Sequence, residues 1–354
     1  MVSNNRVIVF FVIRKIIRKS LQLFYDLLSF RCKQRGVLLI FSKQSLKYEN
    51  LKLLQRALLD EGIDVKITMD GLCLKNIYHL ASSKVICIDQ ATRLTSTIRL
   101  NGKNSLLQVW HAGGAYKKIG YDAWDGTKKD LARIRRIHGS TSWFVVSDSK
   151  LISLYSRAFA LEPSRILPFG LLRSDGYFHR TKQNANYILW APTFRTNSGK
   201  RVIDELSHEI MSLKIEFGKM GYGFAVRLHP SIRIDLEKLG VEDWSNYPLT
   251  CSLGKTRILI TDYSSIIFDY SMYEGAIFWY VRDIDSYMKN ERGLYFNPLI
   301  KYPEFSAITI ESLLEKITIK SRDNCSDVRD EYMSACNGNS CLNTAKFIKQ
   351  LIED

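Results

Sequence analysis

Two histidines stand directly after short apolar runs that have the composition of β-strands. His111 follows the run Leu106–Trp110, and His229 follows Phe224–Leu228. In open α/β sheets, ligands bind beyond the carboxyl ends of the strands, so a side chain in this position can reach a substrate. An imidazole titrates near neutral pH and can move a proton. Both histidines are candidates for chemistry, and a structural histidine at a strand end is the alternative in each case.

Cationic side chains suited to phosphate occur at similar places. Lys117 and Lys118 follow His111 after a glycine-containing turn, which lets the backbone approach a ligand while the two ammonium groups neutralise phosphate charge. Arg195 ends the cluster Ala191–Arg195, which follows another apolar run, and its guanidinium is suited to bidentate phosphate binding. The alternative is that Lys117 and Lys118 are ordinary surface lysines and that Arg195 has no ligand.

A hydroxyl-rich segment, Thr261–Ser265, joins an apolar strand to an apolar helix. Its side chains and the first free amides of the helix converge on one spot, which can hold a pyrophosphate without a glycine-rich loop. Aspartate and serine are also preferred helix caps, and capping and anion binding can coexist. The candidate pyrophosphate-binding residues here are Thr261, Asp262, Ser264 and Ser265.

These residues need two α/β halves to position them. Short apolar runs alternate with helical patterns from residue 36 to about residue 158, and a second alternation begins at residues 187–191. Between them lies a polar stretch over residues 173–186, which is the best candidate for a domain boundary. The pattern predicts two parallel sheets covered by helices.

The charge of the chain favours polyanionic partners. Its 354 residues carry 51 Lys and Arg against 36 Asp and Glu, a formal net charge of +15. Nucleotide phosphates, anionic lipids, phosphate polymers and nucleic acid all satisfy this preference. The seven cysteines are scattered without a C-x-x-C pair, which argues against disulfides and a zinc site and favours a reducing compartment.

Residues 1–33 predict a basic amphipathic helix that associates with a membrane surface. The run Val7–Ile13 is too short to span a bilayer, which takes about 20 residues. No cleavable signal pattern follows it, so we expect the chain to stay inside the cell. Apolar residues recur at helical spacing opposite basic ones, the pattern of an interfacial helix; docking on the protein body is the alternative. The apolar side is Phe10, Ile13, Ile17, Leu21, Phe24 and Leu28.

Taken in order, these clusters resemble the CDP-glycerol glycerophosphotransferase family of teichoic acid primases and polymerases. The similarity runs over about residues 105–297 and consists of WH…KK.G, LLRSD, APTFR, RLHP, TDYSSIIFDY and RGLYF. The resemblance implies an α/β, GT-B-like fold in which two Rossmann-like domains face each other across a cleft. The expected organisation is the helix 1–33, an acceptor domain 34–180 and a CDP-donor domain 181–354.

The resemblance also implies an activity: transfer of glycerol phosphate from CDP-glycerol to a hydroxyl of a lipid-linked or surface-polymer acceptor, with release of CMP. His111 would be the general base, and His229 would stabilise the charge on the departing CMP. No metal or cofactor is implied beyond the CDP-polyol donor, and we expect no nucleic-acid partner. The implied donor-binding residues are Lys117, Lys118, Arg195, Thr261, Asp262, Ser264, Ser265 and Asp269.

One departure from the family pattern bears on the acceptor. The family usually has WHGTPLKKLG, whereas WHAGGAYKKIG here lacks the proline and has one extra residue before the lysines. Three alternatives stay open: a CDP-ribitol donor, a GT-B glycosyltransferase using a nucleotide sugar for capsule or lipopolysaccharide, and a nonenzymatic protein that binds nucleic acid or membranes. The expected location is peripheral, at the cytoplasmic face of a bacterial membrane.

Overall fold

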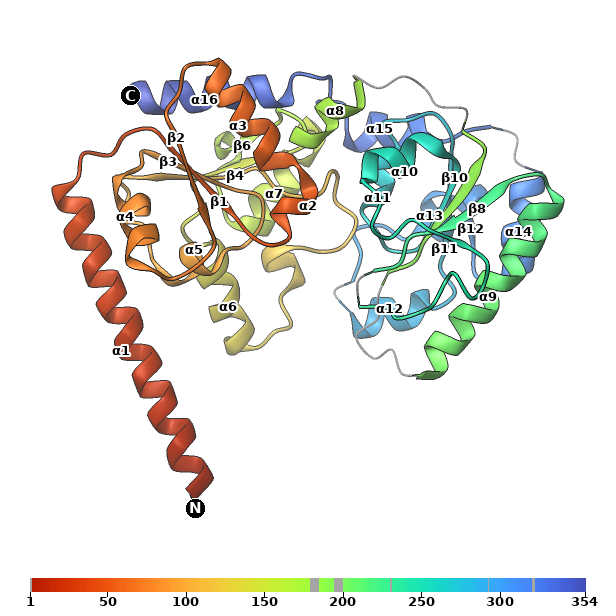
Figure 1. Cartoon of the computed structure of the whole chain (residues 1–354), viewed down its shortest axis with the longest axis horizontal. Coiled ribbons are helices and arrows are strands. Elements are labelled where there is room, and N and C mark those ends of the chain that lie inside the picture. The colour runs from red at the N-terminus through yellow and green to blue at the C-terminus, as the bar shows by residue number, and fades with distance from the viewer. Residues whose placement is uncertain (1, 179–184, 194–199, 230, 292, 320–321) are drawn as a thin grey trace. The chain divides into compact units, whose positions relative to one another are not determined.

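The chain forms two compact units in a computed structural model that describes residues 2–178, 185–193, 200–229, 231–291, 293–319 and 322–354 (Figure 1). The first unit comprises Met1–His111, Gly120–Asp175 and Ala335–Asp354. The second comprises Ala112–Ile119 and Gly176–Ser334. Each unit contains a six-stranded sheet in which every pair of neighbouring strands is parallel, which confirms the predicted α/β class with two Rossmann-like halves.

The sheet of the first unit has the strand order β2-β1-β3-β4-β5-β6. Its central strands β1 and β3 are buried on both faces, because side chains alternate along a strand and helices cover both sides, whereas the edge strand β2 is partly exposed. Leu38 and Ile40 of β1 point into one apolar cluster, and Val37 and Leu39 point into the other. The strands are β1 Val37–Phe41, β2 Val65–Met69, β3 Val85–Ile88, β4 Ser105–Gln108, β5 Trp143–Val145 and β6 Ile166–Leu167.

Helices from distant parts of the chain cover this sheet. The cluster around Val37 includes side chains of α3 and α16, and the cluster around Leu38 includes side chains of α1 and α4. The helices of this unit are α1 Val2–Arg31, α2 Ser45–Tyr48, α3 Asn50–Asp60, α4 Leu74–Ser82, α5 Arg93–Thr97, α6 Lys128–His138, α7 Ile152–Phe159 and α16 Ser340–Glu353, with short 3₁₀ turns at Gly120–Ala123, Ser149–Leu151, Pro163–Arg165 and Leu172–Ser174.

The last helix returns to the first unit, which differs from the division at residue 180 that the sequence suggested. Figure 1 shows α16 (blue) beside α3 (orange-red). The carboxylate of Asp175 accepts hydrogen bonds from the backbone N–H groups of Ser340 and Cys341, at 3.0 and 2.7 Å, at the start of α16. The division between the units falls at Asp175 and Gly176. Helical periodicity shows that a helix has an apolar face but not which sheet it covers.

Helix α1 is docked through its C-terminal half. Tyr25 is fully buried, and its hydroxyl donates to Oδ1 of Asn104 at 2.5 Å. Three residues of the predicted apolar side, Leu21, Phe24 and Leu28, pack on the same cluster. A stripe of apolar side chains remains exposed on α1, and it includes Ile13 and Ile17 of the predicted apolar side. Its members are Ile13, Ile16, Ile17, Leu23, Leu27 and Phe30. Within the described part of the chain, no helix is both long and apolar enough to cross a bilayer.

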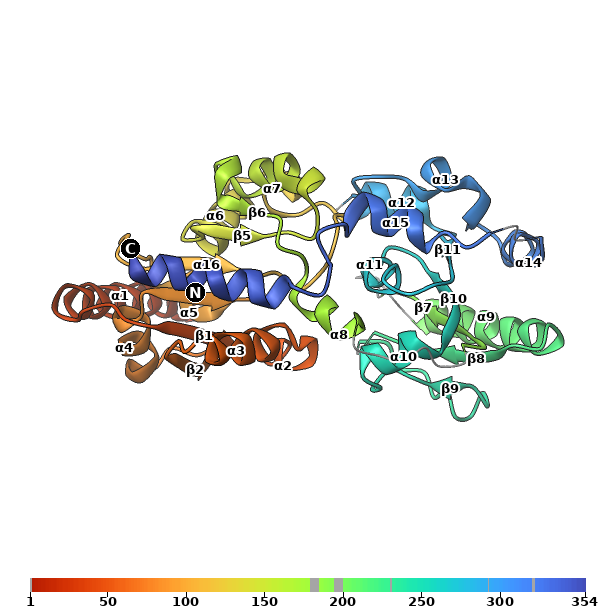
Figure 2. The same cartoon turned by 90° about the horizontal axis from the view of Figure 1, so that it is seen from above.

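The sheet of the second unit has the strand order β12-β11-β10-β7-β8-β9. Helices α9 and α14 lie on one face, whereas α11 and α15 pack together near β10 (Figure 2). The strands are β7 Tyr187–Ala191, β8 Gly223–Val226, β9 Glu242–Asp243, β10 Thr256–Thr261, β11 Ala276–Tyr280 and β12 Ser306–Ala307. The helices are α8 Asp175–Phe178, which starts at the unit boundary, α9 Lys200–Lys219, α10 Leu249–Lys255, α11 Ile266–Tyr270, α12 Ile284–Asn290, α13 Pro298–Lys301, α14 Ile310–Thr318 and α15 Cys325–Tyr332, with a 3₁₀ turn at Pro303–Phe305.

Candidate active site

The first unit gathers polar side chains where its strand order reverses. The chain passes from β1 outward to β2 and then back to β3 on the other side of β1, so the carboxyl ends of β1 and β3 flank the switch point at which open sheets bind ligands. Ser45 lies just after β1, and Asp89 directly follows β3. The Ser45 hydroxyl donates to Oδ1 of Asp89 at 2.6 Å. His111, which follows β4, joins them through the backbone of Asp89.

The imidazole of His111 has a fixed orientation. Its Nδ1 lies 3.2 Å from the backbone carbonyl oxygen of Asp89. Because a carbonyl oxygen only accepts hydrogen bonds, this contact requires the proton of the neutral ring to be on Nδ1. Nε2 then carries the lone pair. The tautomer is the one that a general base acting through Nε2 requires.

The residue before His111 has an unusual backbone. Trp110 adopts φ 56°, a left-handed conformation that a bulky residue adopts only under constraint. Its ring packs against Phe144 and Phe159, with centroid distances of 5.2 and 5.6 Å, and its carbonyl oxygen accepts from Nδ2 of Asn50 at 3.3 Å. These contacts on both sides of the turn hold the chain in this conformation as it enters His111.

Arg173 fixes the same turn from the LLRSD segment. Its Nη1 donates to the carbonyl oxygen of His111 at 2.5 Å, and its backbone N–H donates to Oδ1 of Asn50 at 2.9 Å. The guanidinium also lies over the ring of Tyr48, 5.4 Å from the centroid, and the rings of Tyr48 and His111 are 5.6 Å apart. Arg173 is thus a positioning residue for the histidine.

Asp89 has a buried carboxyl group, and one of its oxygens is already hydrogen-bonded. Burial raises the pKa of its carboxyl to about 6, and this rise is opposed by the Ser45 hydrogen bond and by the positive charge of Arg173. Its Oδ2 has no hydrogen-bond partner among the residues that the structure describes. A buried oxygen without a partner is costly, so this one is suited to receive a donor from a substrate.

In the second unit the corresponding switch point lies between β7 and β10, and an aspartate again occupies it. The carboxylate of Asp262 accepts the backbone N–H of Thr193, at 3.0 and 3.1 Å, and that of Tyr263, at 2.6 Å. Both oxygens are therefore used to tie the end of β7 to the end of β10. Asp262 thus shapes the edge of the sheet.

The other predicted residues of the TDYSSIIFDY segment differ in how deeply they are buried. Thr261 is fully buried and its hydroxyl donates to the carbonyl oxygen of Ala191 at 2.6 Å. Asp269 is also buried and accepts a short hydrogen bond from the hydroxyl of Tyr177. Ser264 and Ser265 are half-buried, and the Ser264 oxygen accepts from the N–H of Ile266 at 3.3 Å. The serines are the more accessible members of the set.

The segment that carries both lysines belongs to the second unit, although sequence order assigned it to the first. Lys117 forms an antiparallel bridge with Leu294, and the backbone N–H of Lys118 donates to the carbonyl oxygen of Gly293 at 3.1 Å. The ring of Tyr116 stacks on Phe296 at 4.5 Å, and its hydroxyl donates to the carbonyl oxygen of Asp262 at 3.0 Å. These contacts fix the lysines to the RGLYF segment.

The extra small residues of this segment are explained by close packing. Gly114 has φ +57°, and a Cβ there would lie 2.2 Å from the Phe268 ring. A Cβ on Gly113 would lie 2.3 Å from the sulfur of Met333. Glycine is required at Gly114, where the backbone is left-handed and the ring is close, whereas a side chain at Gly113 would require the Met333 side chain to move. The Ala112–Ala115 stretch is thus shaped by the surface of α11 and by Met333.

In the second unit, partial desolvation and the positive charge of Lys117 both affect the pKa of His229. His229 is exposed, and its Nδ1 accepts the backbone N–H of Ser231 at 3.2 Å, which leaves the ring proton of the neutral form on Nε2. Partial desolvation and then the positive charge of Lys117 lower the pKa of His229. Near neutral pH this imidazole is therefore neutral and has an Nε2–H to donate.

Arg195 lies outside the described residues, so its predicted role stays a prediction. Sequence reasoning missed Asp89 and Ser45, although both obey the rule that selected the other candidates, because each follows the carboxyl end of an apolar run. Arg173 was quoted within LLRSD but not selected. Among the described residues, no three His, Cys, Asp or Glu side chains are grouped as a metal ion would require.

Comparison with known families and proteins gives a consistent result. Residues 3–350 match the family described as CDP-glycerol:poly(glycerophosphate) glycerophosphotransferase. The teichoic acid glycerol-phosphate primase of Bacillus subtilis is 31% identical over 300 residues, which are 79% of this chain and 77% of that protein. The teichoic acid ribitol-phosphate primase of Bacillus spizizenii is 27% identical over 62% of this chain and 62% of its own length.

A solved structure of the wall teichoic acid polymerase TagF has the same fold. The match has a TM-score of 0.75 at 19% identity and covers 100% of this chain and 98% of that one. At this level of identity the likeness concerns the arrangement of the strands and helices rather than the chemistry of individual residues.

Proposed function

The chain belongs to the CDP-glycerol:poly(glycerophosphate) glycerophosphotransferase family, and on this premise we propose that it transfers glycerol phosphate from CDP-glycerol to a hydroxyl group of a lipid-linked or polymer acceptor in teichoic acid synthesis, releasing CMP. The observation that carries the proposal is the match over residues 3–350. The orientation of His111, whose Nδ1 faces a carbonyl oxygen, supports the assignment of the base.

In the proposed reaction the acceptor oxygen attacks the phosphorus that bears glycerol. A new P–O bond forms to the acceptor, and the bond to the oxygen of CMP breaks with its electron pair. Nε2 of His111 takes the proton of the acceptor hydroxyl. Asp89, at the same switch point, would accept a hydrogen bond from the polyol part of a substrate through its Oδ2. The first unit thus supplies the proton acceptor.

The second unit supplies positive charge and hydrogen-bond donors for the donor diphosphate. The positive charge of Lys117 acts on His229, whose neutral ring offers an Nε2–H, and both side chains would act on the charge that accumulates as CMP leaves. Lys118, Ser264 and Ser265 would complete the contacts to phosphate oxygens. Arg195 would add a bidentate contact, and Thr261, Asp262 and Asp269 would act by shaping the sheet edge.

The test is CMP release by the purified full chain, with a lipid-linked acceptor and CDP-glycerol, CDP-ribitol or UDP-sugars supplied separately. We expect CMP from CDP-glycerol only when the acceptor is present, with glycerol phosphate recovered in the acceptor. Turnover with a UDP-sugar and with neither CDP-polyol would contradict the proposal and favour a nucleotide-sugar glycosyltransferase. Tight nucleic-acid binding without CMP release would favour a binding protein.

CDP-ribitol is the second candidate donor, because the Bacillus spizizenii relative is a ribitol-phosphate primase. Both polyols are small and hydroxylated, so they differ in chain length and in the number of hydroxyl groups that need partners. The ratio of kcat/KM for the two donors decides between them. A ratio in favour of CDP-ribitol would retain the reaction class and change the substrate.

Peripheral membrane association is part of the proposal. The exposed stripe of α1 includes Leu23 and Phe30, which are 60% and 82% exposed, and Lys15, Arg18 and Lys19 are exposed on the same helix. Apolar side chains with basic neighbours favour the surface of an anionic bilayer. We expect Leu23→Ser with Phe30→Ser to reduce flotation with phosphatidylglycerol vesicles, whereas Ile300→Ser, at an 80% exposed position in the second unit, should not. Equal flotation of the wild type, the double variant and Ile300→Ser would contradict membrane binding through α1.

A further inference from the structure

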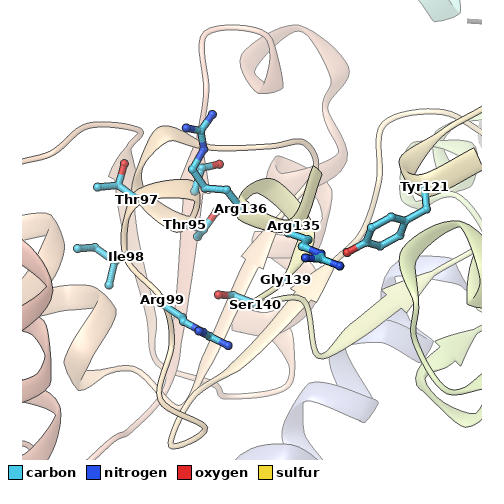
Figure 3. Close-up of a pocket in the computed structure, with 10 residues that line it drawn as sticks. Thr95, Thr97, Ile98, Arg99, Tyr121, Arg135, Arg136, Gly139 and Ser140 are labelled. Carbon is cyan, nitrogen blue, oxygen red and sulfur yellow. The ribbon is translucent and has the colours of Figure 1, made fainter. Parts of the chain in front are cut away.

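A pocket of about 420 Å³ opens in the first unit, and its lining includes none of the residues Ser45, Asp89 and His111. It lies between the end of α5, the residues that follow α5, the turn at Tyr121 and the end of α6 (Figure 3). Three of its lining residues are arginines and no lining residue is acidic. The lining residues are Thr95, Ser96, Thr97, Ile98, Arg99, Tyr121, Arg135, Arg136, Gly139 and Ser140.

The three arginines have no charge partner among the described residues, in contrast to Arg133 and Arg157. Arg133 and Arg157 pair with Asp130 and Asp122, so the nearby acids are already engaged. No guanidinium of the pocket arginines has a hydrogen bond, ion pair or aromatic contact with any residue in the described ranges. All three arginines are exposed. Arg99 and Arg135 carry like charges without a counter-ion among the described residues, and an anion bound between them would offset these charges.

The helix end alone does not explain the cluster. Basic residues are common in the last turn of a helix because they offset the partial negative charge there, and this accounts for Arg135 and Arg136. Arg99 comes from a different segment. Figure 3 shows Arg135 directed toward the phenol oxygen of Tyr121, with Arg99 near Ser140, while the guanidinium of Arg136 points the other way. Hydroxyl donors therefore accompany the two inner guanidinium groups.

Helix α1 holds one side of the pocket in place. The side chain of Gln22 donates to the carbonyl oxygen of Arg99 at 2.9 Å and accepts its N–H at 2.8 Å. Lys19, Arg18 and Lys15 precede Gln22 by three, four and seven residues, so they lie on the same side of the helix, and all three are exposed. A basic strip on α1 thus leads toward Arg99.

We propose that this pocket binds a phosphate-bearing anion of the phosphodiester or diphosphate class. Arginine guanidinium groups and hydroxyls supply the donors that such an anion requires. Its volume is large enough for a diphosphate with part of its ester group. The position beside α1 suits the phosphate of a lipid headgroup, and a free phosphate or diphosphate has the same chemistry. The site is separate from the residues assigned to the transfer reaction and does not depend on that assignment.

The pocket offers a local reporter for the test. His138–Gly139 is the one His-Gly pair in the sequence, and Gly139 lines the pocket. Labelling histidine carbonyls with ¹³C and glycine amides with ¹⁵N therefore isolates a single amide resonance in the full chain. Titration with inorganic pyrophosphate should shift this resonance saturably, whatever happens at the donor site in the second unit.

Two double variants, each of which removes two positive charges, distinguish binding at the pocket from a general effect of surface charge. Arg99→Gln with Arg135→Gln should weaken pyrophosphate binding at Gly139 by about tenfold or more, because each arginine supplies charge-assisted hydrogen bonds. Lys128→Gln with Lys129→Gln removes two charges from exposed positions of α6 outside the pocket, and should change the affinity by less than about twofold. No saturable shift, or equal weakening by both variants, would overturn the proposal.

Vesicles distinguish the two sources of the anion. If a lipid headgroup occupies the pocket, the arginine variant should bind phosphatidylglycerol vesicles more weakly than the lysine variant, and phosphatidylcholine vesicles should show no such difference. If the two variants bind phosphatidylglycerol equally while the Gly139 response to pyrophosphate is lost only in the arginine variant, the occupant is a free anion.

Discussion

The switch points of the two units both carry an aspartate, but the two carboxylates differ in the hydrogen bonds that they accept. Asp89 in the first unit and Asp262 in the second both follow a central strand and both are buried. Asp262 accepts two backbone N–H groups and is committed to tying two strand ends together. Asp89 accepts one hydroxyl, has a raised pKa and presents an oxygen without a partner among the described residues.

The neighbouring groups follow the same division. At its switch point the first unit offers two acceptors, Nε2 of His111 and the Oδ2 of Asp89 that has no partner among the described residues, with the guanidinium of Arg173 bonded to the backbone behind them. The second surrounds its own with donors and positive charge, namely Lys117 and His229. The topology selects where a ligand binds, and the side chains select its charge. This contrast fits a hydroxyl-bearing acceptor at the first unit and an anionic donor at the second.

The largest expected effect is at His111. We expect His111→Ala to lower kcat for CMP release by about 10²–10⁴, the usual contribution of a general base, with little change in KM for CDP-glycerol. His208→Ala, at an exposed position of α9, is the matched control and should behave as wild type. A kcat within a few-fold of wild type for His111→Ala would remove the proton-acceptor role from the first unit.

A smaller loss is expected at His229. Removing a donor to the developing charge should lower kcat/KM for the CDP donor by about 10²–10³. Because the pKa of His229 is lowered, the ring is already neutral at neutral pH and its role is donation through Nε2. The ratio of wild-type to His229→Ala activity should therefore stay constant from about pH 7 to about pH 8.5. A ratio that falls steadily over this range would indicate that the charged imidazolium acts instead.

At Asp262 the expected effect is on stability. Asp262→Ala removes the acceptor of the Thr193 and Tyr263 N–H groups, and should lower the free energy of unfolding by about 2–4 kcal/mol. Asp262→Asn retains one acceptor oxygen and should lose less. Urea unfolding of the variants measures both values. A stable Asp262→Ala protein with impaired donor binding would show that the carboxylate acts on the ligand rather than on the sheet edge.

At Asp89 we expect the opposite effect, a substitution that raises the free energy of unfolding. Its pKa is about 6 in the folded chain and near 4 in the unfolded chain, so the unfolded chain ionises first and stability falls as the pH rises between these values. Above about pH 6 the full penalty applies, and Asp89→Asn should raise the free energy of unfolding by roughly 1–3 kcal/mol near pH 8. Near pH 4 the gain should vanish.

The control for this substitution is Asp60→Asn, an exposed aspartate, which should show no pH-dependent gain. Urea unfolding at both pH values gives the comparison. A destabilised Asp89→Asn protein near pH 8 would mean that the ionised carboxylate is stabilised in the fold, which would end the contrast with Asp262.

Local patterns were sufficient for much of the fold. Runs such as 36–41, 187–191 and 257–261 predicted strands that the structure contains at Val37–Phe41, Tyr187–Ala191 and Thr256–Thr261. These elements are readable because a strand or helix buried in a sheet domain leaves its periodicity in the chain itself.

The sequence by itself determined the two α/β halves, the family and the identities of the polar groups at strand ends. Tertiary structure decided which groups meet. It assigned α16 and the lysine segment to units other than their sequence neighbours, through the Asp175 cap and the bridge of Lys117 to Leu294. It also distinguished Asp89 from Asp262, because a carboxylate's role depends on which donors reach it, and the donors Ser45 and Thr193 are 44 and 69 residues away along the chain.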